Sequence, residues 1–260
     1  MGELLRPLYR ALFPERVRTW LRPFAYPGDT IFGAIVRRAA RGRVVAGPFA
    51  GLSLAPGSAH AYLLGSAERE LHQVIEGFCG QSWKKIVNVG GGNGFYVAGL
   101  GRRIPGAELV VFELVAEARD VIGDTLARNG LTSRTLVLGA ADAPGLEAAL
   151  AGPGPTLVVM DVEGAEMELT DPALVPALRH ATILVETHDV IRPGCRDTVA
   201  ARLADTHAVA AIWTQPRTLA DFPTALFPVL SRVAPARCLK AVQEWRGGPQ
   251  EWLVLTPRAP

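Results

Sequence analysis

Cysteine and long apolar runs are scarce in this chain of 260 residues, and each scarcity excludes a class of protein. The three cysteines, at positions 79, 195 and 238, are too few and too scattered for a disulfide framework or a zinc site. An odd count without any C-x-x-C pair is typical of a reducing compartment. No stretch approaches the roughly 18 uninterrupted apolar residues of a transmembrane helix. Because Arg6, Arg10 and Glu15 also interrupt any signal-peptide pattern, we expect a cytoplasmic protein.

Lysine is rare too, and arginine carries most of the positive charge, which is typical of a GC-rich, bacterial genome. The net charge is only +2, but residues 1–43 hold nine arginines against three acidic residues. We expect a solvated amphipathic helix near residues 3–22, and peripheral contact of residues 1–23 with an anionic membrane is an alternative. The remainder of the chain is net acidic and has no N-P-P-Y-type motif, so no nucleic-acid partner is expected.

Apolar runs and helical segments alternate from Lys85 onward. Strands are expected at 86–89, 109–112, 135–138, 156–160, 182–186, 207–213 and 251–256. Helices are expected at 95–103, 116–129, 143–151, 172–179 and 195–205, and the proline-containing segment 214–250 is expected to be irregular. This alternation predicts an α/β fold with a Rossmann-like, doubly wound, mostly parallel sheet of seven strands. Residues 85–260 would form the ligand-binding domain.

Residues 1–84 are expected to form a lid of helices and a hairpin over that domain. The β-forming segment 43–54, interrupted by Gly47-Pro48, predicts the hairpin. A further helix is expected at 66–79, with Ser66 as its N-cap.

A glycine-rich loop follows the first strand, at Gly90, Gly92 and Gly94. A loop without side chains at the carboxyl end of a parallel strand lets the backbone approach a nucleoside-type cofactor. The spacing is G-x-G-x-G, and Phe95 occupies the position where the dinucleotide fingerprint G-x-G-x-x-G needs its last glycine. The pattern therefore disfavours a dinucleotide and resembles the first motif of class I S-adenosylmethionine (SAM) methyltransferases.

Polar residues at the strand ends complete the predicted cofactor site. Glu113 ends the second strand, where a carboxylate can accept both hydroxyls of a ribose. Asp142 follows the third strand and would accept the adenine amino group, although a plain helix N-cap explains it equally well. Asn88, just before the glycines, can hydrogen-bond the cofactor but cannot pair with its ammonium as an ion.

Five ionisable residues follow the fourth and fifth strands, which would be neighbours in a parallel sheet. They are Asp161, Glu163, Glu186, His188 and Asp189. A histidine among carboxylates can take up a proton near physiological pH, so His188, Asp161 and Glu163 are the candidate catalytic residues. With these three residues in catalysis, the predicted mechanism requires no metal ion. In the alternative, Asp161, Glu186, His188 and Asp189 bind a divalent cation such as Mg²⁺ that holds a deprotonated acceptor.

The segments VNVGGGNGFY, VVFE, MDVEGAE and LVETHD together resemble the FkbM-type SAM-dependent methyltransferases, over about residues 85–190. Residues 161–166 match that family's D-x-E-G-A-E signature without a gap, whereas Asn88 departs from the family's usual Asp. The resemblance implies O-methylation of a small acceptor, such as a sugar or secondary metabolite, with SAM as donor. An N-methyltransferase acting on an amine or peptide, and a catalytically silent SAM-fold binding protein, are the alternatives.

Overall fold

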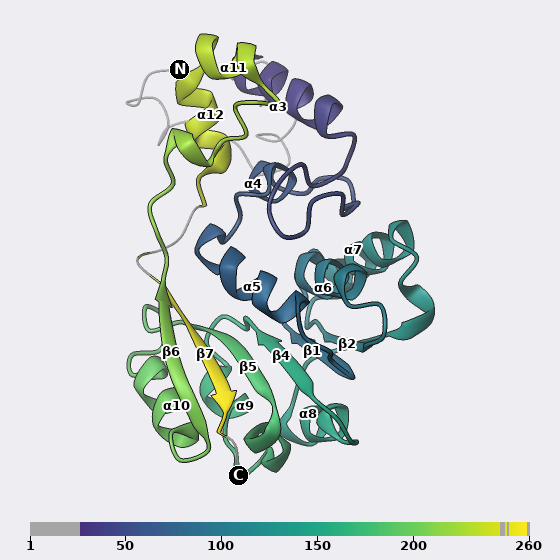
Figure 1. Ribbon diagram of the computed structural model, residues 1–260, viewed down its shortest axis with the longest axis vertical. Coiled ribbons are helices and arrows are strands. Elements are labelled where there is room, and N and C mark those ends of the chain that lie inside the picture. The colour runs from purple at the N-terminus through teal and green to yellow at the C-terminus, as the bar shows by residue number, and fades with distance from the viewer. Residues whose placement is uncertain (1–26, 245–247, 249, 259–260) are drawn as a thin grey trace, which may run out of the picture.

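The computed structural model describes residues 27–244, 248 and 250–258, so the helix expected near residues 3–22 and the membrane contact of residues 1–23 lie outside the described part. Seven strands form one sheet in the order β3-β2-β1-β4-β5-β7-β6 (Figure 1). Their bounds are β1 Lys85–Val89, β2 Glu108–Phe112, β3 Thr135–Leu138, β4 Thr156–Met160, β5 Thr182–Thr187, β6 His207–Trp213 and β7 Glu251–Pro257. The predicted seven-stranded sheet is confirmed.

The connections of β1 create a switch point in this sheet. From β1 the chain moves to β2 and β3 on one side, and then returns to place β4 and β5 on the other side. These five strands are parallel, whereas β7 runs antiparallel between β5 and β6. The loops after β1 and β4 therefore leave the same edge of the sheet side by side, which is where open α/β sheets bind ligands.

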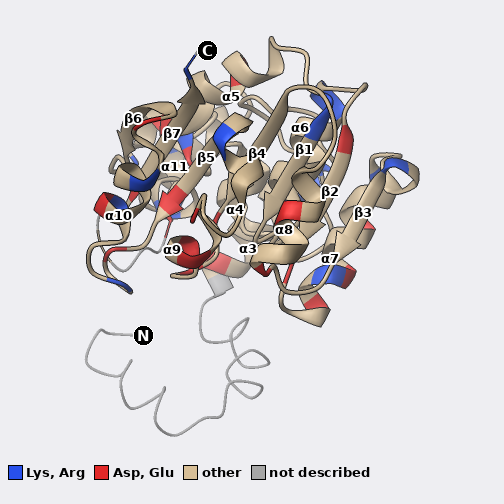
Figure 2. Cartoon of the chain, turned by 90° about the horizontal axis from the view of Figure 1, so that it is seen from below, with Lys and Arg blue, Asp and Glu red and all other residues tan. Residues whose placement is uncertain are grey.

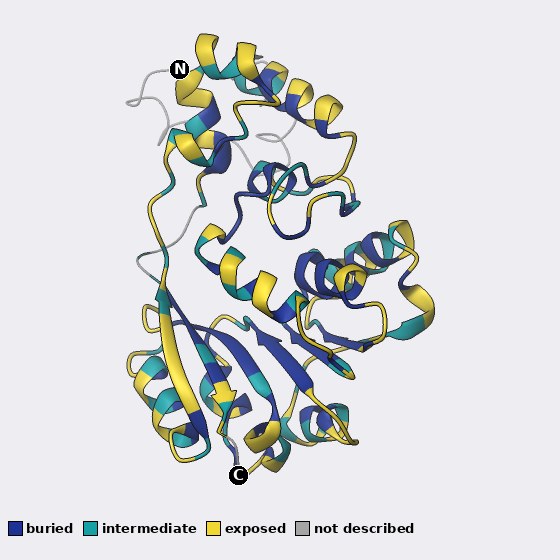
Figure 3. Ribbon diagram, viewed as in Figure 1, coloured by how far each residue is buried: buried dark blue, intermediate teal, exposed yellow. Residues whose placement is uncertain are grey.

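Helices cover both faces of the sheet, because successive apolar residues of each strand point to opposite sides (Figure 1). Ile86 packs in one core and Val87 in the other. One face is covered by α5 His72–Cys79, α6 Phe95–Arg103 and α7 Ala116–Arg128; the other by α8 Ala143–Leu150, α9 Glu166–Leu169 and α10 Cys195–Leu203. The central strands are consequently buried on both sides, as Figure 3 shows in dark blue for β4 and β5.

A smaller helical unit lies above the sheet and brings the first described helix together with the segment between β6 and β7 (Figure 1). It contains α3 Pro27–Ala40, α4 His60–Leu64, α11 Pro228–Val233 and α12 Pro235–Val242. Phe32 and Val36 of α3 share its core with Phe222, Phe227 and Val242. Core contacts thus cross the predicted boundary between residues 84 and 85, and that boundary stays a prediction. In the described residues, no helix has both the length and the apolar character needed to cross a bilayer.

Two expected helices differ from the structure because local backbone chemistry overrode periodicity. The expected helix at 172–179 is a turn followed by the 3₁₀ segment η4 Pro176–His180, since Pro176 has no N–H to continue a helix. The expected helix at 66–79 is shorter, because Glu68 adopts a φ of 46° and α5 begins only at His72, after the 3₁₀ turn η2 Arg69–Leu71.

Ser66 is therefore not an N-cap; its hydroxyl donates to the carbonyl of Ala61. The hairpin expected at 43–54 is reduced to one antiparallel bridge between Arg43 and Ser53. In the segment expected to be irregular, the chain instead forms η5 Leu219–Asp221, α11 and α12.

An ion-pair network ties the segment after β6 to the helical unit and to η2. The Arg217 guanidinium lies 2.7 Å from a carboxylate oxygen of Glu70 and 2.7 Å from one of Glu244. The side chains of Arg217 and Glu70 are only 6% and 3% exposed. Burial opposes the charge, but hydrogen bonds with the two carboxylates raise the pKa of Arg217.

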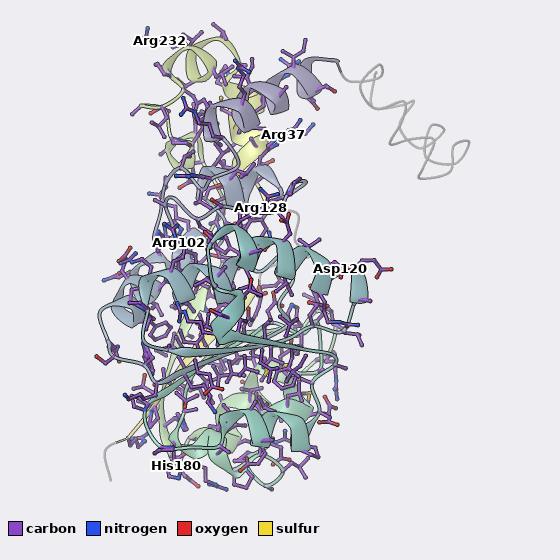
Figure 4. The ribbon with its side chains drawn as sticks, turned by 90° about the vertical axis from the view of Figure 1, so that its right-hand side faces the viewer. Arg37, Arg102, Asp120, Arg128, His180 and Arg232 are labelled. Carbon is purple, nitrogen blue, oxygen red and sulfur yellow. The ribbon has the colours of Figure 1, made fainter. Side chains whose placement is uncertain are left out.

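Replacing Arg217 by alanine would leave buried carboxylates without this cation. We expect Arg217→Ala to lower the free energy of unfolding by about 3 kcal/mol, measured by urea denaturation. The matched control is Arg232→Ala, because Arg232 is an exposed arginine of α11 at the far end of the molecule (Figure 4). The control should change stability by less than about 0.5 kcal/mol. Equal losses in the two variants would contradict a stabilising role of the network.

Candidate active site at the switch point

The glycine loop connects β1 to α6 and is fixed to the end of β2. The N–H groups of Gly90 and Gly91 both donate to the carbonyl of Phe112, at 2.9 and 3.0 Å. Gly90 has a φ of 82°, and a Cβ there would lie 1.7 Å from the carbonyl oxygen of Asp161. A Cβ on Gly92 would meet nothing within 4 Å. Gly90 therefore permits close packing against the β4 loop, whereas Gly92 faces open space.

The structure brings Glu113 and Gly92 together. One carboxylate oxygen of Glu113 accepts the N–H of Gly92 at 2.8 Å, and the other accepts the N–H of Val115 at 2.8 Å. A carboxylate oxygen has two lone-pair sites, so each oxygen can accept one more hydrogen bond. Glu113 is half-buried, and it thus presents two fixed acceptors beside the open side of the loop.

Asn88 and Asp142 have clear roles within the fold. Asn88 is buried, and its amide donates to the carbonyls of Gly90 at 3.3 Å and Val159 at 3.2 Å. Its amide oxygen makes no hydrogen bond to the residues that the structure describes. Asp142 caps α8 by accepting the N–H of Gly145 at 2.8 Å, which is the N-cap explanation. Contact of either residue with a ligand stays a prediction.

The residues after β4 and β5 surround the ring of His188, which is only 1% exposed. Its Nε2 lies 3.4 Å from a carboxylate oxygen of Glu163, 3.6 Å from one of Asp161 and 3.7 Å from one of Glu186. Asp161 and Glu163 are 32% and 74% exposed, whereas Glu186 is 4% exposed. Of the three carboxylates around this ring, those of Asp161 and Glu163 are the ones that reach solvent.

Asp189, by contrast, belongs to the next turn. Its two carboxylate oxygens each accept an N–H at 3.1 Å, from Gly194 and from Arg196, at the start of α10. The structure thus groups three of the four alternative metal ligands, and Asp189 serves α10 instead.

Glu166 organises this cluster, and sequence reasoning did not select it as a site residue. Its side chain is 0% exposed, and one oxygen lies 2.6 Å from Nδ1 of His188. The same oxygen accepts the N–H of Gly164 at 3.1 Å and that of Val162 at 3.4 Å. Glu166 stands at the start of α9, whose acidic residues appear in red in Figure 2. The sequence did show three carboxylates within six residues, at positions 161, 163 and 166, but this pattern does not predict which of them is buried.

Glu163 occupies an unfavourable backbone conformation in the same turn. Its φ is 52°, in the left-handed region that residues with a side chain seldom adopt. Such strain costs of order 1–3 kcal/mol and is common at functional sites. The turn between β4 and α9 therefore holds the Glu163 carboxylate beside His188 at an energetic cost.

Leu114 is an exposed apolar residue at the end of β2, and it was not among the predicted site residues. It directly follows Glu113 and is 74% exposed, although leucine is usually buried. In the sequence it stands out as an apolar residue just beyond the predicted end of the second strand. An apolar surface next to a polar clamp is what a ligand with both a flat ring and hydroxyl groups would contact.

The electrostatics of the cluster favour a charged imidazole. Burial lowers the pKa of His188, but the hydrogen bond with Glu166 and the charges of Glu166, Asp161 and Glu186 outweigh it and raise this pKa to about 9. Burial likewise opposes ionisation of Glu166, yet the hydrogen bond with His188 brings the pKa of Glu166 below its usual value. The two residues therefore form a buried ion pair.

No protein-family model and no curated protein matches this sequence. Among solved structures, the chain is similar to the O-methyltransferase TomG from Streptomyces achromogenes in complex with SAM, at 14% identity and a TM-score of 0.46, covering 78% of this chain and 92% of that one. An O-methyltransferase from Bacillus cereus shows 12% identity and a TM-score of 0.45, with 93% and 97% covered. A precorrin-6y C5,15-methyltransferase from Geobacter metallireducens shows 14% identity and a TM-score of 0.46, with 71% and 88% covered.

At identities of 12–14% and TM-scores below 0.5, these similarities assign no chemistry to this chain. The FkbM resemblance stays a prediction.

The raised pKa of His188 can be observed directly. In chelator-treated protein, we expect the His188 ring resonances to titrate with a midpoint near 9 instead of 6.5, measured by NMR and assigned with His188→Gln. Because the pKa is higher in the folded chain, the ring stabilises the fold fully below pH 6.5, and this contribution is lost as the pH rises through about 9. Glu166→Gln should lower the midpoint. A wild-type midpoint near 6.5 would contradict the ion pair.

Proposed function

We propose that this chain is a SAM-dependent methyltransferase that methylates a hydroxyl group on a small acceptor. The observation that carries the proposal is the hydrogen bond of 2.8 Å between Gly92 and Glu113 at the switch point. It places a carboxylate with free acceptor sites beside a loop whose open side has no side chain. A nucleoside cofactor needs these two features together: hydroxyl acceptors and backbone that can be approached closely.

The donor half of the site would use residues around β1 and β2. Glu113 would accept the two ribose hydroxyls, and Leu114 would lie against the adenine ring. Gly90, Gly92 and Gly94 would let the remainder of SAM approach the backbone. Asn88 stabilises the loop through the hydrogen bond that its side-chain amide donates to the carbonyl of Gly90. Asp142 has one carboxylate oxygen beyond its capping bond and is the candidate acceptor for the adenine amino group.

The acceptor half would use the carboxylates after β4. In the transfer, the acceptor oxygen bonds to the methyl carbon, the carbon–sulfur bond of SAM breaks, and S-adenosylhomocysteine leaves. The hydroxyl proton must go to a nearby base. Asp161 and Glu163 are placed for this because both reach solvent, whereas the ring of His188 is enclosed. We therefore assign proton acceptance to these carboxylates and a positioning role to His188.

Glu113 provides the test of cofactor binding. Removing a charged hydrogen-bond acceptor costs about 1.5–3 kcal/mol, so Glu113→Ala should weaken SAM binding roughly 10- to 100-fold in calorimetry. Glu117→Gln is the matched control, because Glu117 is exposed in the first turn of α7. Wild-type SAM affinity in Glu113→Ala, or no SAM binding by the wild type, would refute the proposal and favour a protein that works by binding a partner.

Asp161 provides the test of chemistry. We expect the wild type to form S-adenosylhomocysteine from SAM with at least one member of a panel of sugars, phenols and amines, followed by mass spectrometry. Loss of a general base costs about 10²- to 10⁴-fold in rate, so Asp161→Asn should lower turnover by that factor and leave SAM affinity unchanged. Methylation of amines alone, with full activity in Asp161→Asn, would replace O-methylation by N-methylation.

A further inference from the structure

The Nε2 atom of His188 is buried and has no hydrogen bond to the residues that the structure describes. Three carboxylate oxygens nevertheless surround it, at 3.4, 3.6 and 3.7 Å. An N–H group that donates to a carboxylate comes to about 2.7–2.9 Å. The ring is therefore oriented toward the centre of this group without bonding to any single member.

The distances between these atoms are suited to ligands of a single metal ion. Two ligand atoms bound to the same cation at about 2.1 Å lie roughly 3.0–4.2 Å apart, depending on the coordination angle. Ligand atoms of Asp161, Glu186 and His188 all lie within 4.8 Å of one another, so small rotations of the side chains bring them into range. A single imidazolium would balance one of the surrounding negative charges, whereas a divalent cation would balance two.

The other ring nitrogen is held in the way that a metal ligand requires. Glu166 accepts from Nδ1 of His188 at 2.6 Å, which fixes the ring and directs the Nε2 lone pair at the three carboxylates once the ring is neutral. A carboxylate bound to the second ring nitrogen is the usual partner of a metal-binding histidine. Glu166 is itself fixed by the N–H groups of Val162 and Gly164.

We propose that Asp161, Glu186 and His188 bind one divalent transition-metal cation, while Glu163, on the solvent side, stays available as the proton acceptor. An imidazole among carboxylates favours Mn²⁺, Fe²⁺ or Zn²⁺ over Mg²⁺ and Ca²⁺, which prefer oxygen ligands alone. The exposed edge at Asp161 and Glu163 supplies the entry path. Asp189 is left out of the ligand set because the ligand atoms that lie within 4.8 Å of one another belong to Asp161, Glu186 and His188, while the oxygens of Asp189 cap α10.

The cation would also narrow the substrate class. This step rests on the proposed methyltransferase function. A cation at the carboxyl end of β4, beside the glycine loop, would bind an acceptor through oxygen and favour its deprotonated form. Acceptors with two adjacent hydroxyl groups, which can bind one ion through both oxygens, are then preferred over monohydroxy acceptors and amines.

Binding of Mn²⁺ alone tests the site without any acceptor. After removal of metals with a chelator, we expect the full-length protein to bind one equivalent of Mn²⁺ in a titration followed by electron paramagnetic resonance. Spin-echo modulation should show a directly bound imidazole nitrogen, and His188→Gln should abolish that signal. Asp161→Asn and Glu186→Gln should weaken binding at least tenfold, and Glu166→Gln about 10- to 100-fold.

Glu168→Gln is the matched control, because Glu168 lies on α9 beside the cluster but pairs with Arg192 on the surface. It should bind Mn²⁺ as the wild type does. Circular dichroism establishes that each variant folds, and SAM calorimetry separates this proposal from the proposed function, since Glu186→Gln should still bind SAM. The cation site is refuted if the wild type binds neither Mn²⁺ nor Zn²⁺, if no nitrogen modulation appears, or if the ligand variants match the control.

Discussion

The contact between Gly90 and the backbone of Asp161 is the constraint on which the arrangement of the site depends. The N–H of Asp161 donates to the carbonyl of Val89 at 2.9 Å, so the β1 and β4 ladder continues up to the loops. Only glycine fits at position 90, because the Asp161 carbonyl occupies the place of a Cβ. Because Gly90 and Asp161 lie at the switch point of the sheet, the loops after β1 and β4 turn in opposite directions directly beyond this contact. The glycine loop then reaches Glu113 on one side, and Asp161 faces His188 on the other.

The two halves of the site are built by different kinds of interaction. On the β1–β2 side, the key contacts involve backbone N–H groups, as in the bonds of Glu113 to Gly92 and Val115. On the β4–β5 side, they involve charged side chains around His188. Burying Glu166 is costly unless it is paired and hydrogen-bonded, and both conditions are met by His188 and by the N–H groups of the preceding turn. The β4–β5 side therefore contains the group with a strongly shifted pKa, since its charges raise the pKa of His188 to about 9.

The sequence predicted the sheet well because its strands are continuous apolar runs, which is what burial on both faces requires. The prediction failed where single residues decide the backbone, as with Pro176 in the expected helix at 172–179 and the positive φ of Glu68. Strand ends also predicted which loops converge, because parallel neighbours end at one edge. They could not predict that Asp189 turns toward α10 while Glu166 turns inward, since that depends on the loop geometry beyond each strand.

The two halves of the site differ in how far their residues can change. A side chain at Gly90 would collide with the carbonyl of Asp161, directly after β4, so this position of the β1 loop must remain glycine. Asp161 and Glu163 are partly exposed side chains on a loop, and a change there alters charge without moving the sheet. Val190 and Ile191, 60% and 51% exposed just after His188, lie next to this variable half. Under the proposed function, specificity for the acceptor would belong to the loops after β4 and β5, and binding of the donor to the backbone after β1 and β2.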